Sequence, residues 1–226
     1  MNKKIEIPRF TWWDWFLILG FVSASFTVSV LTKEFSVLSF VAGTCSILCM
    51  IFGAKGDMLN FPFGLVGSII LGYIMFGSGV LGMAVYYLLY NAPMQIVGWF
   101  KWNKRRLSDD SAVIKTRWMT WKQRILMVLS TLVIAVVLYF ILRNKETDSW
   151  IDAVAVAVIV VTQFVLVFAF IEQWFLWLLY DFIMVAIWII KWKDGVSYAS
   201  IQLILQLFYL INAFRGIFQW SKLEKA

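Results

Sequence analysis

ILMVLSTLVIAVVLYFIL, residues 125–142, contains no charged side chain and indicates which solvent this chain folds in. A helix of about 20 apolar residues crosses the ~30 Å hydrocarbon core of a bilayer. The rest of the chain has the same character, because 62% of its 226 residues are hydrophobic and only 15% are charged. We therefore expect an all-α integral membrane protein rather than a soluble domain.

Further apolar stretches are expected to form helices, and they leave little polar sequence between them. These stretches are residues 12–32, 36–54, 61–77, 80–100, 150–171, 174–192 and 197–219. They leave no room for a soluble catalytic domain. The N-terminal stretch follows Lys3, Lys4 and Arg9 but lacks a small-residue cleavage site, so we expect this helix to be kept rather than removed as a signal peptide.

Basic residues concentrate in the segment that follows the fourth stretch. They are Lys101, Lys104, Arg105, Arg106, Lys115, Arg117, Lys122 and Arg124, against Asp109 and Asp110. Short basic loops stay in the cytoplasm, so eight spans with both chain ends cytoplasmic fit the charges. The net charge of +7 therefore indicates orientation in the membrane and not a nucleic-acid partner.

Tryptophans near the predicted helix ends are expected to lie in the aromatic belts at the two membrane–water interfaces. These residues are Trp99, Trp102, Trp118, Trp121, Trp192 and Trp220.

Several classes of chemistry are excluded by what the sequence lacks. It has no histidine, and Cys45 and Cys49 alone make a poor metal site, so their expected role is packing. It also has no G-x-x-x-x-G-K phosphate-binding run. We predict no catalytic residues, no metal and no cofactor, and facilitated diffusion rather than transport driven by ATP.

An internal repeat is suggested by an ungapped comparison of the chain with itself. The comparison that pairs 36–54 with 154–172 and 61–77 with 179–195 also pairs Gly77 with Gly195, Gly98 with Gly216, Phe100 with Phe218 and Trp102 with Trp220. Two three-helix units joined by one linker helix would face the same way, which gives a SWEET-like 3+1+3 parallel repeat. The predicted divisions are an N-terminal tail and extra helix (1–35), a first bundle (36–102), a basic loop and linker helix (103–150) and a second bundle with the C-terminal tail (151–226).

Candidate binding residues on the seventh stretch are aromatic and acidic. Trp174, Trp177 and Asp181 share one helical face, with Tyr180 beside them. Two indoles stacked one turn apart, with a carboxylate beyond them, would suit a flat cationic ring. The alternative is that the indoles face lipid while Asp181 pairs with another helix.

Polar residues inside other predicted spans complete the candidate site, because polar groups in a membrane are retained for function or for helix packing. Tyr87, Asn91 and Gln95 share a face of the fourth stretch, in which Pro93 removes a backbone donor and is expected to kink the helix. The further candidates are Asn60 at the third stretch and Tyr209 and Asn212 on the eighth.

Two motifs in these stretches are similar to the PnuC family of vitamin B3 transporters. One is Asn91-Ala92-Pro93-Met94-Gln95-Ile96-Val97-Gly98-Trp99, and the other is Glu172-Gln173-Trp174 followed by Trp177. Shorter matches occur at Lys55-Gly56, Asn60-Phe61, Phe63-Gly64-Leu65, Tyr87 and 209–212, so the resemblance covers about residues 36–220. Asp181 departs from the amide that the family pattern carries at its position.

The resemblance implies a facilitator for nicotinamide riboside in the bacterial inner membrane, with a SWEET-like fold and a homotrimeric assembly. It also implies a cytoplasmic kinase that traps the riboside by phosphorylation. Trp174 and Trp177 would hold the ring, and Asn91 and Gln95 would bind its polar groups. The alternatives are a carrier of thiamine, riboflavin, a deoxynucleoside or sugar, an intramembrane enzyme, or a structural subunit of a larger complex.

Overall fold

The computed structural model describes residues 10–32, 36–77, 81–108, 111–143, 149–195 and 199–225, and its regular elements are helices. They are α1 (Trp12–Thr32), α2 (Val37–Ala54), α3 (Asn60–Gly77), α4 (Leu81–Val85), the π-helix η1 (Tyr86–Asn91), α5 (Ala92–Asn103), α6 (Trp121–Leu142), α7 (Ser149–Val167), α8 (Gln173–Lys193) and α9 (Ala199–Lys225). The all-α prediction is confirmed. The predicted 80–100 helix corresponds to α4, η1 and α5 in succession, while Asp109 and Asp110 lie outside the described residues.

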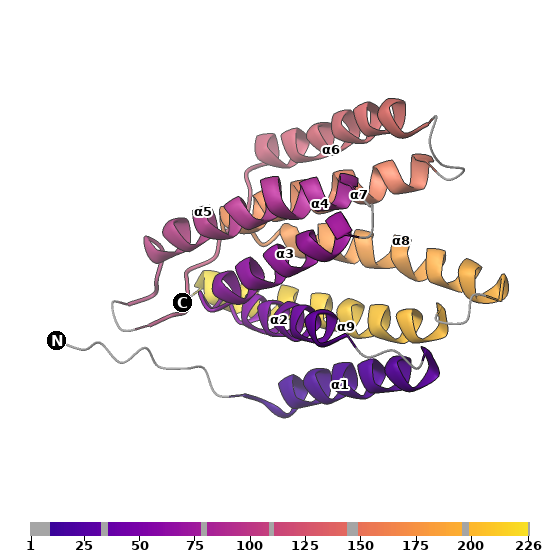
Figure 1. Cartoon of the computed structure of the whole chain (residues 1–226). Coiled ribbons are helices and arrows are strands. Elements are labelled where there is room, and N and C mark those ends of the chain that lie inside the picture. Colours follow the sequence, from indigo (N-terminus) through magenta and orange to yellow (C-terminus); the bar gives the residue numbers. More distant parts are fainter. Residues whose placement is uncertain are drawn as a thin grey trace.

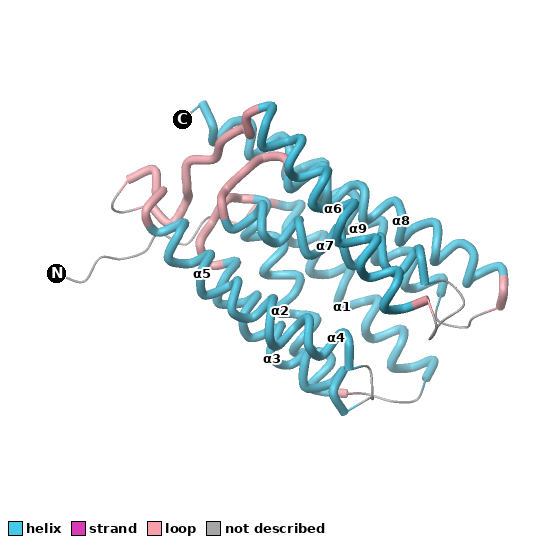
Figure 2. Tube along the Cα trace, turned by 90° about the horizontal axis from the view of Figure 1, so that it is seen from above, coloured by secondary structure: helices cyan, strands magenta, loops and turns pink. Residues whose placement is uncertain are grey.

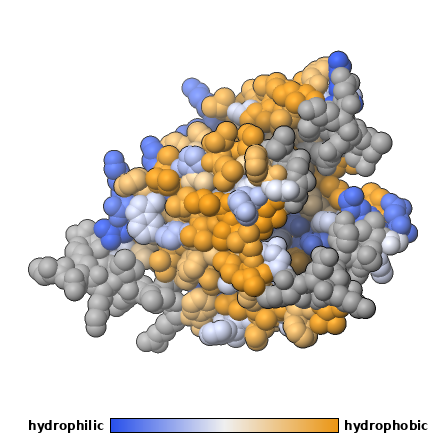
Figure 3. All heavy atoms as spheres, in the orientation of Figure 1, coloured by the Kyte–Doolittle hydropathy of each residue, from blue (hydrophilic) through white to orange (hydrophobic). Residues whose placement is uncertain are grey.

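The helices are suited to a bilayer by length and by the side chains they expose. Within the described residues, α2, α3, α6 and α8 are each long and apolar enough to cross a membrane. The most exposed of these is α6, whose outer face carries residues such as Leu126, Leu132 and Val136. Apolar side chains cover much of the visible surface (Figure 3). The chain is a multi-pass membrane protein.

The helices form two groups that pack against each other, the first helix of each group against the last helix of the other. The first group is α2, α3 and the α4–η1–α5 run, and the second is α7, α8 and α9. Between the groups, α2 packs on α9 and α5 packs on α7. The remaining helices lie at opposite edges of the bundle, where α1 packs on α2 and α9, and α6 packs on α7 (Figure 1).

Two buried indoles cross between the groups. Trp102 Nε1 donates to the Leu166 carbonyl at 3.0 Å, and Trp220 Nε1 donates to the Gly53 carbonyl at 2.8 Å. Both indoles are 0% exposed, so the prediction that Trp102 and Trp220 lie in interfacial belts is wrong. The physical reason is that carbonyls in the last turn of a helix are available as acceptors for a buried indole N–H.

The helix starts place the two groups in a register different from the one that the self-comparison used. α3 begins at Asn60 and α8 at Gln173, and each follows a turn with a positive-φ residue, Gly56 at 66° and Ala169 at 59°. The self-comparison that pairs 61–77 with 179–195 is therefore displaced from the pairing of α3 with α8 in the structure. The pairing of Trp102 with Trp220 agrees with the structure, because each indole donates to a carbonyl of the other group. The greater length of α8, which has 21 residues where α3 has 18, accounts for part of this displacement. The SWEET-like repeat itself stays a prediction.

The described parts of the segment of residues 104–120, which are 104–108 and 111–120, lie between α5 and α6 and cover the turns of both groups at one end of the bundle (Figure 2). Ile114 N donates to Gly56 O at 3.0 Å, and Arg117 N donates to Ala169 O at 3.1 Å. Thr116 Oγ1 donates to the carbonyl of Trp220 at 2.6 Å. This segment therefore ties α2, α7 and α9 together at one end of the bundle.

Two buried carboxylates near this end are neutralised by basic residues. Asp14, which is 0% exposed, lies 2.6 Å from Lys55 Nζ and 2.7 Å from Arg215 Nη1 and so fastens α1 to the bundle. Glu172 accepts from Arg124 Nε at 2.8 Å and from the Met119 backbone N–H at 3.0 Å. Each carboxylate thus connects its own helix or turn to another part of the chain.

Candidate functional site

A cavity of about 280 Å³ lies between the two helix groups. Small-molecule sites are typically concave and largely preformed, with a few convergent polar groups. All the residues predicted as candidates line this cavity, although they come from five different elements. They are Asn60 on α3, Tyr87 and Asn91 on η1, Gln95 on α5, Trp174, Trp177, Tyr180 and Asp181 on α8, and Tyr209 and Asn212 on α9.

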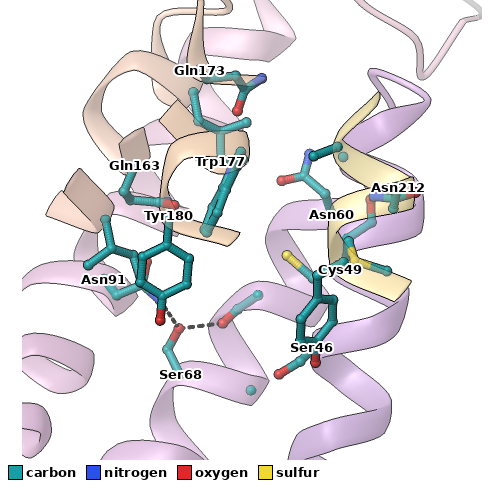
Figure 4. Close-up of a pocket in the computed structure, with 18 of the residues that line it drawn as sticks. Ser46, Cys49, Asn60, Ser68, Asn91, Gln163, Gln173, Trp177, Tyr180 and Asn212 are labelled. Atoms are coloured by element: carbon teal, nitrogen blue, oxygen red, sulfur yellow. Dashed lines mark hydrogen bonds between the residues drawn. The ribbon is translucent and has the colours of Figure 1, made fainter. Parts of the chain in front are cut away.

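The indoles of α8 contribute to the wall in different ways. Trp174 is 4% exposed and packs edge-on against Trp220, with ring centroids 5.8 Å apart. Trp177 packs edge-on against Tyr180 at 6.0 Å and projects between Gln163 on one side and Asn60 on the other (Figure 4). These ring contacts are with Trp220 and Tyr180, and stacking of the two indoles on each other stays a prediction. Trp177 is the more accessible aromatic face.

A π-turn places the polar side chains of the first helix group. The Ala92 backbone N–H donates to Tyr87 O, five residues back, so the helix widens before Pro93. The predicted kink at Pro93 stays a prediction, and the structure adds a short π-helix just before this residue, a feature often found at functional sites. Tyr86, Tyr87 and Asn91 consequently all face the cavity.

Hydrogen bonds fix the amides that follow this turn. Asn91 Nδ2 donates to Ser68 Oγ at 2.9 Å, and Gln95 Nε2 donates to Asn91 Oδ1 at 3.3 Å. Gln95 lies across Gly64, where a Cβ atom would be 2.6 Å from Gln95 Oε1. Glycine at position 64 therefore provides the space that the Gln95 amide occupies.

Several buried polar atoms around the cavity have no protein partner among the described residues. They are Asn60 Oδ1, Gln95 Oε1, Gln163 Nε2, Gln173 Nε2 and Oε1, Trp174 Nε1 and Asn212 Oδ1. A buried polar group left unpaired costs about 1–3 kcal/mol, so such groups are suited to a ligand with hydroxyl or amide functions. Sequence reasoning did not select Gln163 or Gln173, although their position inside apolar stretches was a usable signal.

Asp181 is the acidic residue of the cavity wall. Its side chain is 3% exposed, and Oδ1 accepts a 2.6 Å hydrogen bond from Gln206 Nε2 on α9. Asp181 thus contacts another helix, as the alternative interpretation proposed, and also lines the cavity. Asp181 is the one carboxylate among the described lining residues, which include no lysine or arginine.

This set of groups defines the chemistry that the cavity can accept. Aromatic faces bind a flat ring, amides bind hydroxyl and carboxamide groups, and a buried carboxylate favours a cation. Across the described residues, no group of three His, Cys, Asp or Glu side chains could hold a metal ion.

Comparison with known proteins places these observations in a family. The model of the nicotinamide mononucleotide transporter family matches residues 36–222. The nicotinamide riboside transporter PnuC of Neisseria mucosa is 27% identical over 240 residues, covering 99% of this chain and 90% of that protein. The transporter of the same name from Haemophilus influenzae is 26% identical over 212 residues, covering 91% of this chain and 88% of that protein. The crystal structure of the vitamin B3 transporter PnuC superposes with a TM-score of 0.78 at 27% identity, over 97% of this chain and 94% of that one.

Proposed function

This chain belongs to the nicotinamide mononucleotide transporter family, and from that premise we propose that it carries nicotinamide riboside across the membrane through the cavity between the helix groups. Family membership makes it a transporter and not an enzyme. The observation that carries the choice of substrate is the composition of the cavity wall. It combines Trp177, buried amides and the Asp181 carboxylate without a described basic residue.

The wall favours the riboside over the mononucleotide that the family description names. Nicotinamide riboside has a pyridinium cation, a carboxamide and ribose hydroxyls, and the cavity offers an anion and unpaired amide atoms for these groups. A phosphate group would bring negative charge to a site that already holds Asp181. Phosphate recognition normally uses arginine, lysine or helix N-termini, and the described lining provides no such basic side chain.

Within this proposal, each predicted residue has a role that follows from its position. The faces of Trp177 and Trp174 hold the ring, and Asp181 neutralises its charge. Asn91 and Gln95 bind the carboxamide or hydroxyls from one helix group. The remaining polar positions, which include Asn60, Tyr87, Tyr180, Tyr209 and Asn212, complete the contacts.

The wider setting that we propose rests on the family resemblance and on the charge distribution. The chain lies in the bacterial inner membrane with its basic 104–120 segment in the cytoplasm, and it assembles as a homotrimer. A cytoplasmic kinase phosphorylates the imported riboside and prevents its return. The two helix groups rock about the cavity to give alternating access, so facilitated diffusion needs no ATP.

Ligand-dependent stability tests the proposal directly. A ligand that binds only the folded state raises the unfolding temperature as its concentration exceeds Kd. We expect stabilisation of the purified protein by nicotinamide riboside, and little or none by nicotinamide mononucleotide, uncharged nicotinamide or riboflavin. Stabilisation by thiamine alone would assign a different cationic vitamin to the same site, and no stabilisation by any of them would refute the proposal.

A pair of tryptophan variants links that result to the cavity. Trp177→Ala removes an indole that lines the cavity, whereas Trp192→Ala changes a 57% exposed indole on the same helix. Loss of an aromatic stacking partner is worth about 1–3 kcal/mol, or roughly 5- to 150-fold in Kd. We expect this loss for Trp177→Ala and near-normal binding for Trp192→Ala. Equal effects of the two would place the riboside elsewhere.

A further inference from the structure

Two basic side chains lie against the turn that joins α7 to α8. Lys101 Nζ, in the last turn of α5, lies 4.9 Å from the centre of the Phe168 ring. Arg117 Cζ lies 4.2 Å from the centre of the Phe170 ring, and Arg117 Nε donates to the Phe168 carbonyl at 3.3 Å. Aromatic faces and a neutral carbonyl hold a cation in place. They supply no negative charge that would neutralise it.

A third cation lies beside Arg117. Arg105 follows α5, and its Nε donates to the Lys115 carbonyl at 3.2 Å. Burial and then the nearby Arg117 guanidinium lower the pKa of Arg105 below its ordinary value of 12.5. Two neighbouring guanidinium groups repel each other, so an anion placed against both would lower the electrostatic energy of the folded protein.

No carboxylate of the described part of the chain compensates Lys101, Arg105 and Arg117, which we call the basic cluster. Asp14 and Glu172 have other basic partners, and no described carboxylate oxygen lies within 4.0 Å of a side-chain nitrogen of the basic cluster. The Nη groups of both arginines donate no hydrogen bond to a described protein acceptor. The basic cluster therefore has donors and positive charge left for an external anion.

An exposed aromatic side chain connects the basic cluster to the apolar surface of α7. The Phe164 side chain is 54% exposed, and the centres of the Phe164 and Phe168 rings lie 4.9 Å apart. Phe168 is the ring on which Lys101 Nζ lies. Because Phe164 comes four residues earlier, within α7, it lies deeper in the span than the basic cluster. Cations at a helix end with an exposed apolar face beside them match the headgroup and the acyl chains of a phospholipid.

We propose that the basic cluster and Phe164 form a site for one anionic phospholipid. The headgroup phosphate lies against the basic cluster, and an acyl chain lies along Phe164. Guanidinium groups bind phosphate oxygens through paired N–H donors, and lysine adds a point charge. Basic pockets between membrane helices bind such headgroups. A zwitterionic phospholipid carries a cation of its own and compensates the basic cluster less well, so the site selects lipids by charge.

The bound lipid supports the turn from which α8 starts. Arg117 N donates to Ala169 O at 3.1 Å, and Ile171 N donates to Arg117 O at 2.9 Å. A headgroup that holds the Arg117 side chain therefore stabilises the start of the helix that carries Trp174 and Trp177. The site is separate from the cavity, whose lining includes neither the basic cluster nor Phe164. The proposal consequently does not depend on which substrate is transported.

Thermal unfolding in lipid titrations gives the first test. The purified protein is washed in neutral detergent until a phosphorus assay detects no lipid. It is then titrated at constant ionic strength with phosphatidylglycerol, with phosphatidylcholine of the same acyl chains, and with inorganic phosphate. A ligand of the folded state raises the unfolding temperature as its concentration exceeds Kd, and we expect the largest rise with phosphatidylglycerol. Equal effects of the two lipids would refute selection by charge, and an equal effect of phosphate would assign the basic cluster to a free anion instead of a lipid.

Matched variants test where the lipid binds. Lys101→Gln and Arg105→Gln each remove one charge of the basic cluster. Lys122→Gln removes an exposed charge at the start of α6, and Lys193→Gln removes one at the far end of α8. Loss of one basic contact weakens binding of an anionic lipid by about fivefold, and loss of two by roughly 25-fold. We expect these losses of phosphatidylglycerol affinity for the single and double variants of the basic cluster, and little change for Lys122→Gln and Lys193→Gln.

Two other results of these measurements would overturn the proposal. An equal loss for Lys122→Gln would mean that phosphatidylglycerol is attracted to this end of the protein without a defined site. A changed oligomeric mass of Lys101→Gln in light scattering, with phosphatidylglycerol affinity unaltered, would assign the basic cluster to a contact between copies of the chain. Lys101 is exposed and donates no described hydrogen bond, so Lys101→Gln is expected to fold even if Arg105→Gln does not.

Discussion

Gly216 on α9 sets the position of Trp174 at the edge of the cavity, and Gly216→Ala should displace that indole. A Cβ at position 216 would lie 2.4 Å from both Cδ2 and Cε2 of Trp174. Because carbon atoms pack best at about 3.5–4.0 Å, the ring must move by roughly 1 Å. Overpacking of this kind costs about 1–3 kcal/mol, and the higher helix propensity of alanine returns up to about 1 kcal/mol.

Thermal unfolding and riboside binding measure the two consequences of this substitution. We expect a lower unfolding temperature and a riboside Kd raised about 5- to 30-fold, which corresponds to about 1–2 kcal/mol. Gly77→Ala is the matched control, because no described atom lies within 4 Å of a Cβ placed at this position at the end of α3. If Gly216→Ala and Gly77→Ala behave alike in both assays, the packing of Trp174 does not define the site.

Three further substitutions test the joints and the charges of the fold. Trp220→Phe removes the hydrogen bond to Gly53 O, so it should lower the free energy of unfolding by about 0.5–1.5 kcal/mol in denaturant titrations, while Trp192→Phe should have little effect. Glu172→Gln weakens the charge-assisted bonds that hold the 104–120 segment, and it should lower that energy by about 1.5–3 kcal/mol; an unchanged value would mean that the segment is held by its backbone bonds alone. Burial raises the pKa of Asp57 above its ordinary value of 3.8, so the folded protein favours the protonated carboxyl. The free energy of unfolding of the natural protein therefore falls as the pH rises and this carboxyl must ionise in the folded state. Asp57→Asn should therefore stabilise the protein more at pH 7 than at pH 4 in thermal unfolding, and equal shifts at both values would contradict the assignment.

The helices and the candidate residues could be predicted because both have a local signal. Long apolar runs predict helices from composition alone, and the described helix ends lie within a few residues of the predicted ones, apart from α9, which runs on to Lys225. Polar residues such as Asn91 and Asp181 stand out because a bilayer makes them costly. All the predicted candidates line one cavity for this reason.

The errors concern features that depend on contacts between distant segments. Trp102 looked like an interfacial residue because it ends an apolar helix, and only the position of Leu166 in the other group shows that it is buried. The π-helix η1 was not predicted, because Pro93 alone suggests a kink and gives no signal for the wider turn that precedes it. Gln163 and Gln173 line the cavity because the fold places α7 and α8 beside it, and their own sequence positions do not show this.

The crossed indole bonds have a consequence for how this end of the bundle opens. Trp102 of the first group bonds to α7, and Trp220 of the second group bonds to α2, so each group holds the other. Separation of the groups must break both bonds together, which makes opening an all-or-none event rather than a graded one. Two such bonds contribute about 1–3 kcal/mol in total to the contact between the groups. A movement that separates the groups at this end must therefore offset both this reciprocal latch and the apolar packing of the two indoles in the buried cluster that they share.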